Sequence, residues 1–495
     1  MLLLAFAALA SFPPMTVDLT GADPGTWEEW AAGEPSIAPF SVETIIGPPA
    51  GASTDFAVLI EEGLADSLVP GTIERWVADM EPWVGGVLVA EASYSTPEEL
   101  RAWLLDMHAQ GLEGVVLVGD LPVAWVMLDN AFARDSETFP CDYFYMDLDG
   151  LWEDLWIGYP SAGIPGTDGK YDTWDTSGMS PEIYCARIIT SKTTIGAEDS
   201  LLQAYLDRNH EWRTVGDPLP FQALCYVDND WAVWGAEFRD AMMQLYPVVE
   251  LINDEEQTCG TDYEENRLPV VYEWISPFVH SGPTFHQWNP GPETHWNEVT
   301  AIDPPARFYN LFACSNSRFT TPRNMGSIYV FGTTHGLASV GSTKTGSMLE
   351  FESFYATLGA GGNLGQAFRD WWTHINAGGF TPYEMSWHLG MVLIGDPTLV
   401  PASPMLGIPG GVPGHAVPSM SFVENPCRGS VSILLPGAGE ALVRIFDPSG
   451  RLVASREVTG GGGPVEIDMP GMPRGVYTAV ASSEGGSVSG RFALL

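Results

Sequence analysis

The sequence predicts an α/β protein with two side-by-side parallel-sheet units and a small antiparallel β-sandwich at its C-terminal end. Short apolar segments alternate with helical ones over residues 55–215, and the same alternation restarts over residues 216–400. Apolar, β-branched strands separated by helices are typical of a parallel sheet covered by helices. After residue 420 the pattern changes to short strands broken by Gly and Pro turns, which predicts a sandwich over residues 421–495.

The first unit contains three clear strand candidates, DFAVLI, GGVLVA and EGVVLVGD. A helix is predicted between the second and third, because Thr96 can cap it, Pro97 suits its first position and Glu99 completes a capping box. Gly111 ends this helix, and another is predicted over residues 69–80. An acidic, loop-rich insertion then runs over residues 122–180, before the strand PEIYCARII and a helix over residues 197–212.

The second unit begins with the predicted strand FQALCYV, a helix over residues 231–245 and the strand VVELI. Further strands are predicted at EWISPFVH, ARFYNLFAC, GSIYVFGTT and LASVGS, with helices around residues 348–358 and 363–375. The unit closes with MVLIGDPTLV. Residues 401–420 are rich in Pro and Gly and are interpreted as a linker to the sandwich.

The N-terminal residues predict export. Residues 1–15, MLLLAFAALASFPPM, contain an apolar run that is too short to cross a bilayer and fits the core of a secretory signal, although a basic start is missing. Residues 16–54 are interpreted as an N-terminal extension. We therefore expect a secreted or cell-surface protein.

The charge of the chain is strongly one-sided. Asp and Glu number 63 against 21 Lys and Arg, which gives a formal net charge of −42. Such a surface repels phosphate backbones, so no nucleic-acid partner is expected. An acidic surface suits the binding of calcium or of cationic substrates. A general acidic surface that keeps the protein soluble explains the net charge equally well.

Polar residues at the predicted strand ends mark where chemistry is expected, because ligands of parallel sheets collect beyond the carboxyl ends of the strands. These residues are Asp120, Asp228, Asp230, His280, Cys314 and Asp396. A thiol needs a base or cation nearby to become a thiolate at neutral pH, and a histidine on the neighbouring strand can supply it. Cys314 after an apolar strand is either a buried structural thiol or a nucleophile, and His280 favours the nucleophile.

The cysteines point to no metal centre. The six cysteines contain no CxxC pair, so a zinc site is not expected, and their even number leaves disulfides open.

The strand ends PFVHSG and NLFACSN resemble the gingipain-like cysteine peptidases of the caspase–legumain–clostripain clan. In that clan an apolar strand ends in His-Gly and a later one in Ala-Cys. The resemblance extends in order over about residues 55–400 and includes VVLVGDLP, CDYFYMDLDG, PEIYCARI, FQALCYVDND, GSIYVFGTT and LIGDPTL. It implies two caspase-like subdomains.

The resemblance also implies residue roles. Cys314 matches the nucleophile, His280 the partner imidazole, and Asp230 the carboxylate that orients it, with Asp228 as the alternative. The oxyanion donors would be the backbone N–H groups of Cys314 and of Gly282 or Ser281. One departure is that Ser281 separates His280 from the glycine, which shifts the donor by one position.

Substrate preference transfers less directly. The relatives prefer Arg or Lys before the cut and use an acid near the start of the helix after VDND, where Glu237 is the candidate in this chain.

Calcium is the one ion that the sequence suggests. The segment DLDGLWED places Asp147, Asp149 and Asp154 at turn-accessible positions, and family members bind calcium. The chemistry itself requires no cofactor, and a solvated acidic turn is the alternative reading.

The C-terminal segment resembles the immunoglobulin-like sorting modules of type IX secretion substrates, through its NPC opening and its GVYTAVAS and GRFALL strands. This implies an outer-membrane secretion machinery as a partner, although the usual basic tail is absent.

The resulting hypothesis is a secreted cysteine endopeptidase that cleaves proteins or peptides through a Cys-His dyad and an acyl-enzyme. Two alternatives stay open: a sortase-like transpeptidase of secreted proteins, and a catalytically inactive surface or adhesion protein. The sequence does not determine the oligomeric state.

Overall fold

The coordinates come from a computed structural model of the chain. It describes residues 20–132, 135–214, 219–401, 421–422, 427, 429–434, 439–446, 452–460, 464–483 and 486–494. The predicted signal segment, residues 1–15, and almost all of the predicted linker, residues 401–420, lie outside this range.

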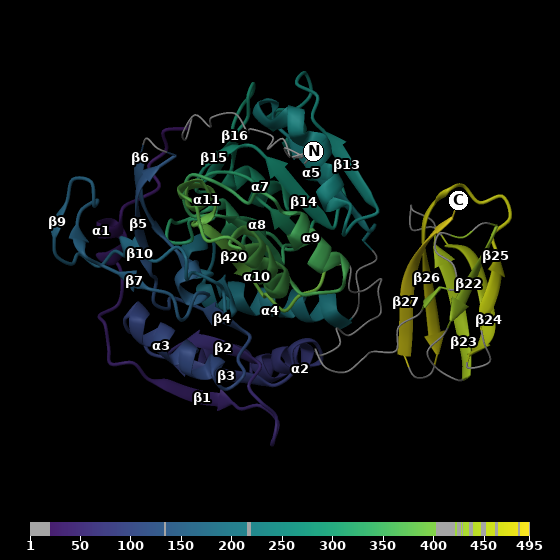
Figure 1. Ribbon diagram of the computed structural model, residues 1–495, viewed down its shortest axis with the longest axis horizontal. Coiled ribbons are helices and arrows are strands. Elements are labelled where there is room, and N and C mark those ends of the chain that lie inside the picture. The colour runs from purple at the N-terminus through teal and green to yellow at the C-terminus, as the bar shows by residue number, and fades with distance from the viewer. Residues whose placement is uncertain are drawn as a thin grey trace, which may run out of the picture.

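A large, mostly parallel sheet forms the centre of the molecule (Figure 1). Its strand order is β1-β3-β2-β4-β11-β20-β19-β18-β14-β12-β13. The strands are β1 (Val42–Ile46), β2 (Phe56–Glu61), β3 (Val87–Ala92), β4 (Gly114–Val118), β11 (Tyr184–Ile188), β12 (Gln222–Val227), β13 (Val248–Ile252), β14 (Trp274–Phe278), β18 (Phe308–Asn310), β19 (Ala338–Ser342) and β20 (Met391–Gly395). The predicted α/β class is confirmed, and the two predicted units share this one sheet.

Apart from the edge strand β1, which pairs antiparallel with β3, the sheet consists of two parallel blocks that run in opposite directions. The first block is β3, β2, β4, β11 and β20, and the second is β19, β18, β14, β12 and β13. They meet where β19 pairs antiparallel with β20. The carboxyl ends of the two blocks therefore lie at opposite edges of the sheet, and only strands of the second block end at the edge where His280 and Cys314 emerge.

Helices connect the strands and bury them. The main ones are α2 (Thr72–Val84), α3 (Pro97–His108), α4 (Glu198–Thr214), α5 (Gly235–Met242), α8 (Met325–Phe331), α9 (Glu352–Gly359) and α10 (Leu364–Ile375). Shorter helices are α1 (Trp27–Ala31), α6 (Gly260–Asp262), α7 (Trp296–Ile302) and α11 (Pro382–His388). The predicted start of α3 is confirmed, because Thr96 and Glu99 form a capping box and Pro97 occupies the first turn.

One predicted strand is wrong. The segment GSIYVFGTT contains the helix α8, and all seven residues of that helix are buried. Its β-branched and aromatic residues are typical of a strand, but the Asn324 side chain accepts a hydrogen bond from the Ser327 N–H and starts a helix. A helix that is buried on every side is apolar on every side, so the spacing of its hydrophobic residues does not distinguish it from a strand.

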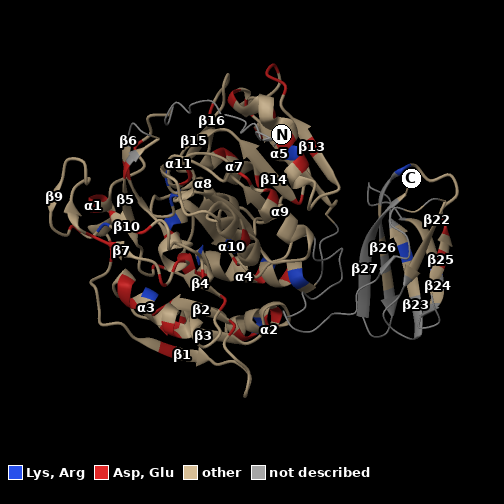
Figure 2. Cartoon of the chain, in the orientation of Figure 1, with Lys and Arg blue, Asp and Glu red and all other residues tan. Residues whose placement is uncertain are grey.

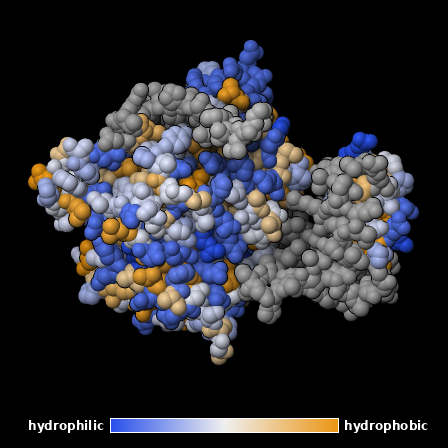
Figure 3. All heavy atoms as spheres, in the orientation of Figure 1, coloured by the Kyte–Doolittle hydropathy of each residue, from blue (hydrophilic) through white to orange (hydrophobic). Residues whose placement is uncertain are grey.

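The predicted loop-rich insertion contains several short hairpins. They are built from β5 (Trp125–Ala131), β6 (Asp135–Pro140), β7 (Trp152–Glu153), β8 (Trp156–Ile157), β9 (Ile164–Pro165) and β10 (Thr173–Trp174). The β8–β9 hairpin projects at the far left of Figure 1, and its apolar side chains Ile157 and Ile164 are 46% and 63% exposed. Hydrophobic atoms also lie at this edge of the molecule in Figure 3.

The C-terminal residues form two antiparallel sheets, drawn at the right of Figure 1. One sheet is β21-β22-β25 and the other β24-β23-β26-β27. The strands are β21 (Ser421–Phe422), β22 (Ser430–Leu434), β23 (Gly439–Phe446), β24 (Leu452–Gly460), β25 (Val465–Asp468), β26 (Gly475–Ser483) and β27 (Gly486–Leu494). Val431 and Ile467 of the first share a buried cluster with Val443 and Tyr477 of the second. The immunoglobulin-like character and a role in secretion stay predictions.

Acidic side chains are spread over the helices and loops of the large domain, with few basic ones between them (Figure 2). Among the described residues, no helix is long and apolar enough to span a bilayer.

Candidate active site

The pairing of β14 with β18 determines where His280 and Cys314 lie. The two strands run parallel, and a bridge pairs Phe278 with Phe312 just beyond them. His280 is two residues past Phe278 and Cys314 is two residues past Phe312, so both leave the sheet at the same height on adjacent chains. The hydrogen bond from the Val279 N–H to the Phe312 carbonyl, at 3.1 Å, keeps the chains paired up to this point.

The chain turns sharply after Cys314. Ser315 has a left-handed φ of 54°, and its N–H donates to the Lys344 carbonyl at 2.9 Å. The Asn316 side-chain amide donates to the carbonyls of Leu311 and Ala313, both at 2.9 Å. These bonds end the strand and fix the backbone on both sides of the thiol.

Two side chains, Asp230 and Trp231, contact the His280 ring. Its Nε2 lies 2.8 Å from Oδ2 of Asp230, and its ring centroid lies 4.3 Å from that of Trp231. Both partners belong to the turn after β12, which pairs with β14. With Nε2 directed to a carboxylate, Nδ1 is the ring nitrogen that can serve the thiol.

Asp228, the alternative orienting carboxylate, has a different environment. It is fully buried, and its Oδ1 accepts the Asn289 N–H at 3.1 Å. Burial raises the pKa of Asp228 to about 7. The structure thus places Asp230, not Asp228, against the imidazole.

Cys314 differs in position from Cys185 and Cys225. It is only 4% exposed, and none of the six cysteines is joined in a disulfide. Cys185 and Cys225 lie within strands, and burial raises their pKa values far above the ordinary range. Those two thiols are structural, whereas Cys314 lies at the end of a strand.

Ser281 and Gly282, the two predicted oxyanion donors, form the strand β15 (His280–Gly282) with His280. This strand pairs antiparallel with β16 (Phe285–Gln287), and β16 pairs with β17 (Thr294–His295). The Ser281 side chain points away from the dyad, because its hydroxyl lies 2.6 Å from Nδ1 of the buried His286. Only the backbone of Ser281 can therefore face a substrate.

The N-terminal extension lies against both loops of the site. A Cβ atom on Gly282 would come within 2.8 Å of Ala22. On the other loop, Arg318 donates to the Gly25 carbonyl and Thr321 donates to the Pro24 carbonyl, both at 2.7 Å.

Glu237, the predicted specificity residue, is exposed on the first turn of α5. The next residue, Phe238, stacks on Phe278 with ring centroids 4.2 Å apart and lies 5.7 Å from Phe312. This packing brings α5 close to both strand ends. The role of Glu237 in substrate binding stays a prediction.

Two acids of the predicted set lie elsewhere. Asp120 and Asp396 follow strands of the first block, so they are at the opposite edge of the sheet. Asp396 is buried and binds Arg213 at 2.9 Å, and Asp120 accepts the Ser191 hydroxyl at 3.0 Å. Each of these two carboxylates binds a neighbouring side chain and so takes part in a structural contact.

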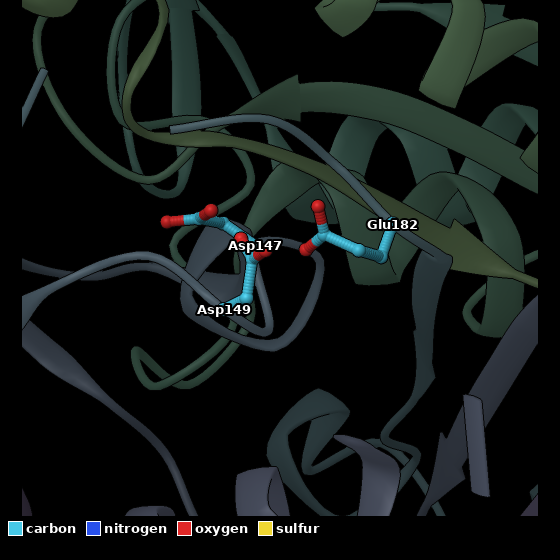
Figure 4. A group of neighbouring side chains, drawn as sticks. All are labelled: Asp147, Asp149 and Glu182. Carbon is cyan, nitrogen blue, oxygen red and sulfur yellow. The ribbon is translucent and has the colours of Figure 1, made fainter. Parts of the chain in front are cut away.

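The structure rearranges the predicted calcium ligands. Asp147, Asp149 and Glu182 have carboxylate oxygens within 4.8 Å of one another (Figure 4). Asp154 is outside this group, because its carboxylate accepts the backbone N–H groups of Asp168 and Gly169. Glu182 was missed because it follows the insertion, 35 residues beyond Asp147. Burial raises the pKa values of Asp147 and Glu182, so a cation would favour their ionised forms.

Comparisons with known proteins give distant similarities only. No family model and no curated protein matches the chain. The crystal structure of the Arg specific cysteine proteinase gingipain R has a TM-score of 0.49 and 13% identity, over 89% of this chain and 98% of that one. Dimeric latent PorU from Porphyromonas gingivalis has a TM-score of 0.32 and 9% identity, over 89% of this chain and 43% of that one. At these values neither structure assigns an activity to this chain.

Proposed function

We propose that this chain is a cysteine endopeptidase in which Cys314 and His280 act as a dyad. The observation that supports it most is the register of β14 and β18, which brings the imidazole and the thiol to equal positions past the Phe278–Phe312 bridge. The 2.8 Å contact between His280 and Asp230 adds the orienting carboxylate that such a dyad uses.

The reaction follows from these positions. His280 Nδ1 accepts the proton of the Cys314 thiol, and the thiolate attacks the carbonyl carbon of a peptide bond. Backbone N–H groups near Cys314 and Ser281 stabilise the oxyanion that forms. The imidazolium then protonates the leaving amine, and water hydrolyses the thioester to release a carboxylic acid and restore the thiol.

Asp230 makes the imidazole effective. Its carboxylate fixes the ring so that Nδ1 faces the thiol, and it stabilises the positive charge that the ring carries in the intermediate. Trp231 packs against the ring, with the centroids 4.3 Å apart and the planes tilted by 53°, and limits its rotation.

The decisive experiment replaces the nucleophile. Cys314→Ala is expected to abolish cleavage of a proteome-derived peptide library and labelling by a peptidyl acyloxymethyl ketone. Cys259→Ala is the matched control, because Cys259 is more exposed than Cys314 and would take up non-specific label. Full cleavage by the Cys314→Ala protein would contradict the proposal.

Product analysis addresses the transpeptidase alternative. With an added amine such as glycine amide, hydrolysis products are expected to dominate, and a majority of amide products would favour a sortase-like transferase. If the wild-type protein forms neither product and no thiol is labelled, the alternative of a catalytically inactive surface or adhesion protein is favoured. Secretion, and export machinery as a partner, remain part of the proposal.

A further inference from the structure

A buried polar chain begins at Ser281, the residue next to His280. The Ser281 hydroxyl lies 2.6 Å from Nδ1 of His286, and Nε2 of His286 lies 3.2 Å from the Tyr329 hydroxyl. The Tyr329 hydroxyl lies 3.1 Å from that of Tyr263. All four residues are fully buried, so Ser281 and His286 cannot form a second nucleophile–base pair that a substrate reaches.

His286 is a fixed, neutral member of this chain. Burial lowers its pKa to about 3, so the ring carries one proton at working pH and pairs one donor nitrogen with one acceptor nitrogen. A buried network in which every member has a partner orients its groups strongly. The serine side chain is therefore held in one position by β16 and α8.

The direction of the Ser281 N–H follows from the strand pairing. The Val279 N–H points to β18, because it donates to the Phe312 carbonyl. Successive N–H groups of an extended chain alternate in direction, so the Ser281 N–H points to the same side, where Cys314 lies.

The hairpin turn supports the same assignment. Gly282 pairs with Phe285 across the two-residue turn Pro283–Thr284, and the closing pair of such a turn is hydrogen-bonded. The neighbouring pair, Ser281 with His286, is then non-hydrogen-bonded. The Ser281 N–H is left available, whereas Gly282 is turned toward Phe285.

We infer that His286 is a positioning residue, which holds the Ser281 backbone N–H in the direction of the oxyanion through its hydrogen bond to the Ser281 hydroxyl. This inference rests on the proposed peptidase function. It gives a role to the serine that separates His280 from Gly282, because a glycine at this position would have no side chain for the network to hold.

Two substitutions of His286 separate the two ends of the ring. In His286→Asn the amide takes the place of Nδ1 and keeps the contact with Ser281, while in His286→Gln it reaches toward Tyr329 and loses that contact. His286→Gln is expected to lower kcat about tenfold on an internally quenched peptide, with KM little changed. His286→Asn is expected to recover most of that loss.

A second measurement separates positioning from general damage. Alkylation of Cys314 by iodoacetamide needs the thiolate but no oxyanion donor, so its rate is expected to stay at the wild-type value in His286→Gln. Ser281→Ala is expected to lower kcat to the same extent, and adding His286→Gln to it should lower kcat no further, because the two residues act as one unit.

The outcomes are distinguishable. Wild-type kcat in His286→Gln, additive losses in the double variant, or alkylation that falls in parallel with kcat would each overturn the inference. If His286→Gln does not fold, Ser281→Ala with the same pair of readouts decides it. Absence of Cys314-dependent turnover in the wild-type protein would overturn the proposed function itself, and this inference with it.

Discussion

At the scale of single residues, the consecutive pair Asp230 and Trp231 controls His280 from two directions. The carboxylate takes the Nε2 edge of the ring, and the indole covers one face. A ring held by these two contacts keeps only small rotations, so in the proposed reaction its remaining nitrogen would accept the thiol proton with little loss of entropy. One turn after β12 therefore provides both the charge and the packing for the proposed base.

His388 gives a residue-scale prediction about pH. It is buried, and neither ring nitrogen has a hydrogen-bond partner among the described residues. Burial lowers its pKa from 6.5 to about 3. Between these values the unfolded chain binds a proton that the folded chain does not, so this group lowers the stability as the pH falls below 6.5.

The variant His388→Phe removes that effect. Its free energy of unfolding minus that of wild type is expected to be about 2 kcal/mol larger at pH 5 than at pH 8, because only wild type loses stability as the pH falls. Urea denaturation at both pH values measures the difference. His374→Phe, at an exposed position, is the control and should show no such change. If the free energies of unfolding of His388→Phe and wild type differ by the same amount at both pH values, the prediction is contradicted.

Residue-scale features were predictable from sequence where they depend on strand ends. His280, Cys314 and Asp230 follow apolar runs, and the contact of His280 with Asp230 and the position of Cys314 on the adjacent strand need only the pairing order of three strands. Glu182 and His286 were not predictable in this way. Their partners lie across an insertion and across a hairpin, and their contacts depend on turn geometry that no periodic pattern records.

At the scale of elements, the insertion is tied to the second block of the sheet by a buried ion pair. Lys344, in the loop after β19, lies 2.9 Å from the Glu137 carboxylate of the β5–β6 hairpin, and its side chain is completely buried. The Lys344 carbonyl also accepts the Ser315 N–H beside Cys314. The β5–β6 hairpin therefore helps to hold the loop after β19, and that loop in turn holds the backbone next to Cys314.

Glu137→Gln tests this support. It leaves a buried ammonium without its counter-charge, so we expect a loss of about 3 kcal/mol in the free energy of unfolding. The solvent-accessible pair Arg239–Asp240 provides the control, and Asp240→Asn is expected to cost less than about 1 kcal/mol. Denaturant unfolding of the two variants gives both values, and equal costs would argue against the buried pair.

The carboxylate group of Figure 4 carries the calcium prediction. Calcium is expected to raise the melting temperature, by an amount equivalent to about 1.4 kcal/mol at ten times the Kd. Asp149→Asn and Glu182→Gln should remove the shift, and Asp154→Asn should keep it, because Asp154 binds backbone N–H groups instead. The reverse pattern would restore the ligand set first predicted from sequence.

Elements were predicted well where propensity and environment agree, as at α3 and at the apolar strands of the first block. The prediction failed at α8, where full burial removes the polar face that identifies a helix. The hairpins of the insertion are only two to seven residues per strand, too short for a pattern to predict their pairing.

At the scale of the whole molecule, the chain carries a net charge of −42. Like charges repel one another most strongly in the compact state, and salt screens that repulsion. We expect the melting temperature to rise by roughly 2 °C or more between 10 and 500 mM sodium chloride. Differential scanning calorimetry at increasing salt concentrations measures this rise. A melting temperature independent of salt would contradict this view.

The class of the molecule was readable from its alternating strands and helices, but the opposed direction of the two blocks was not. That direction is set by β20, which follows the second block in sequence and joins the first block in space. A single antiparallel pairing thus decides which strand ends share an edge, and it separates Asp120 and Asp396 from His280.

The N-terminal extension also provides one edge strand of the sheet, since β1 pairs antiparallel with β3 and is the outermost strand on that side. Trimming that removed residues 42–46 would uncover the unpaired amides and carbonyls of an apolar strand, which invites self-association. A proteolytic cut in the extension would therefore have different effects on either side of this strand: a cut ahead of Val42 leaves the edge covered, and a cut after Ile46 does so only while the severed strand stays paired with β3.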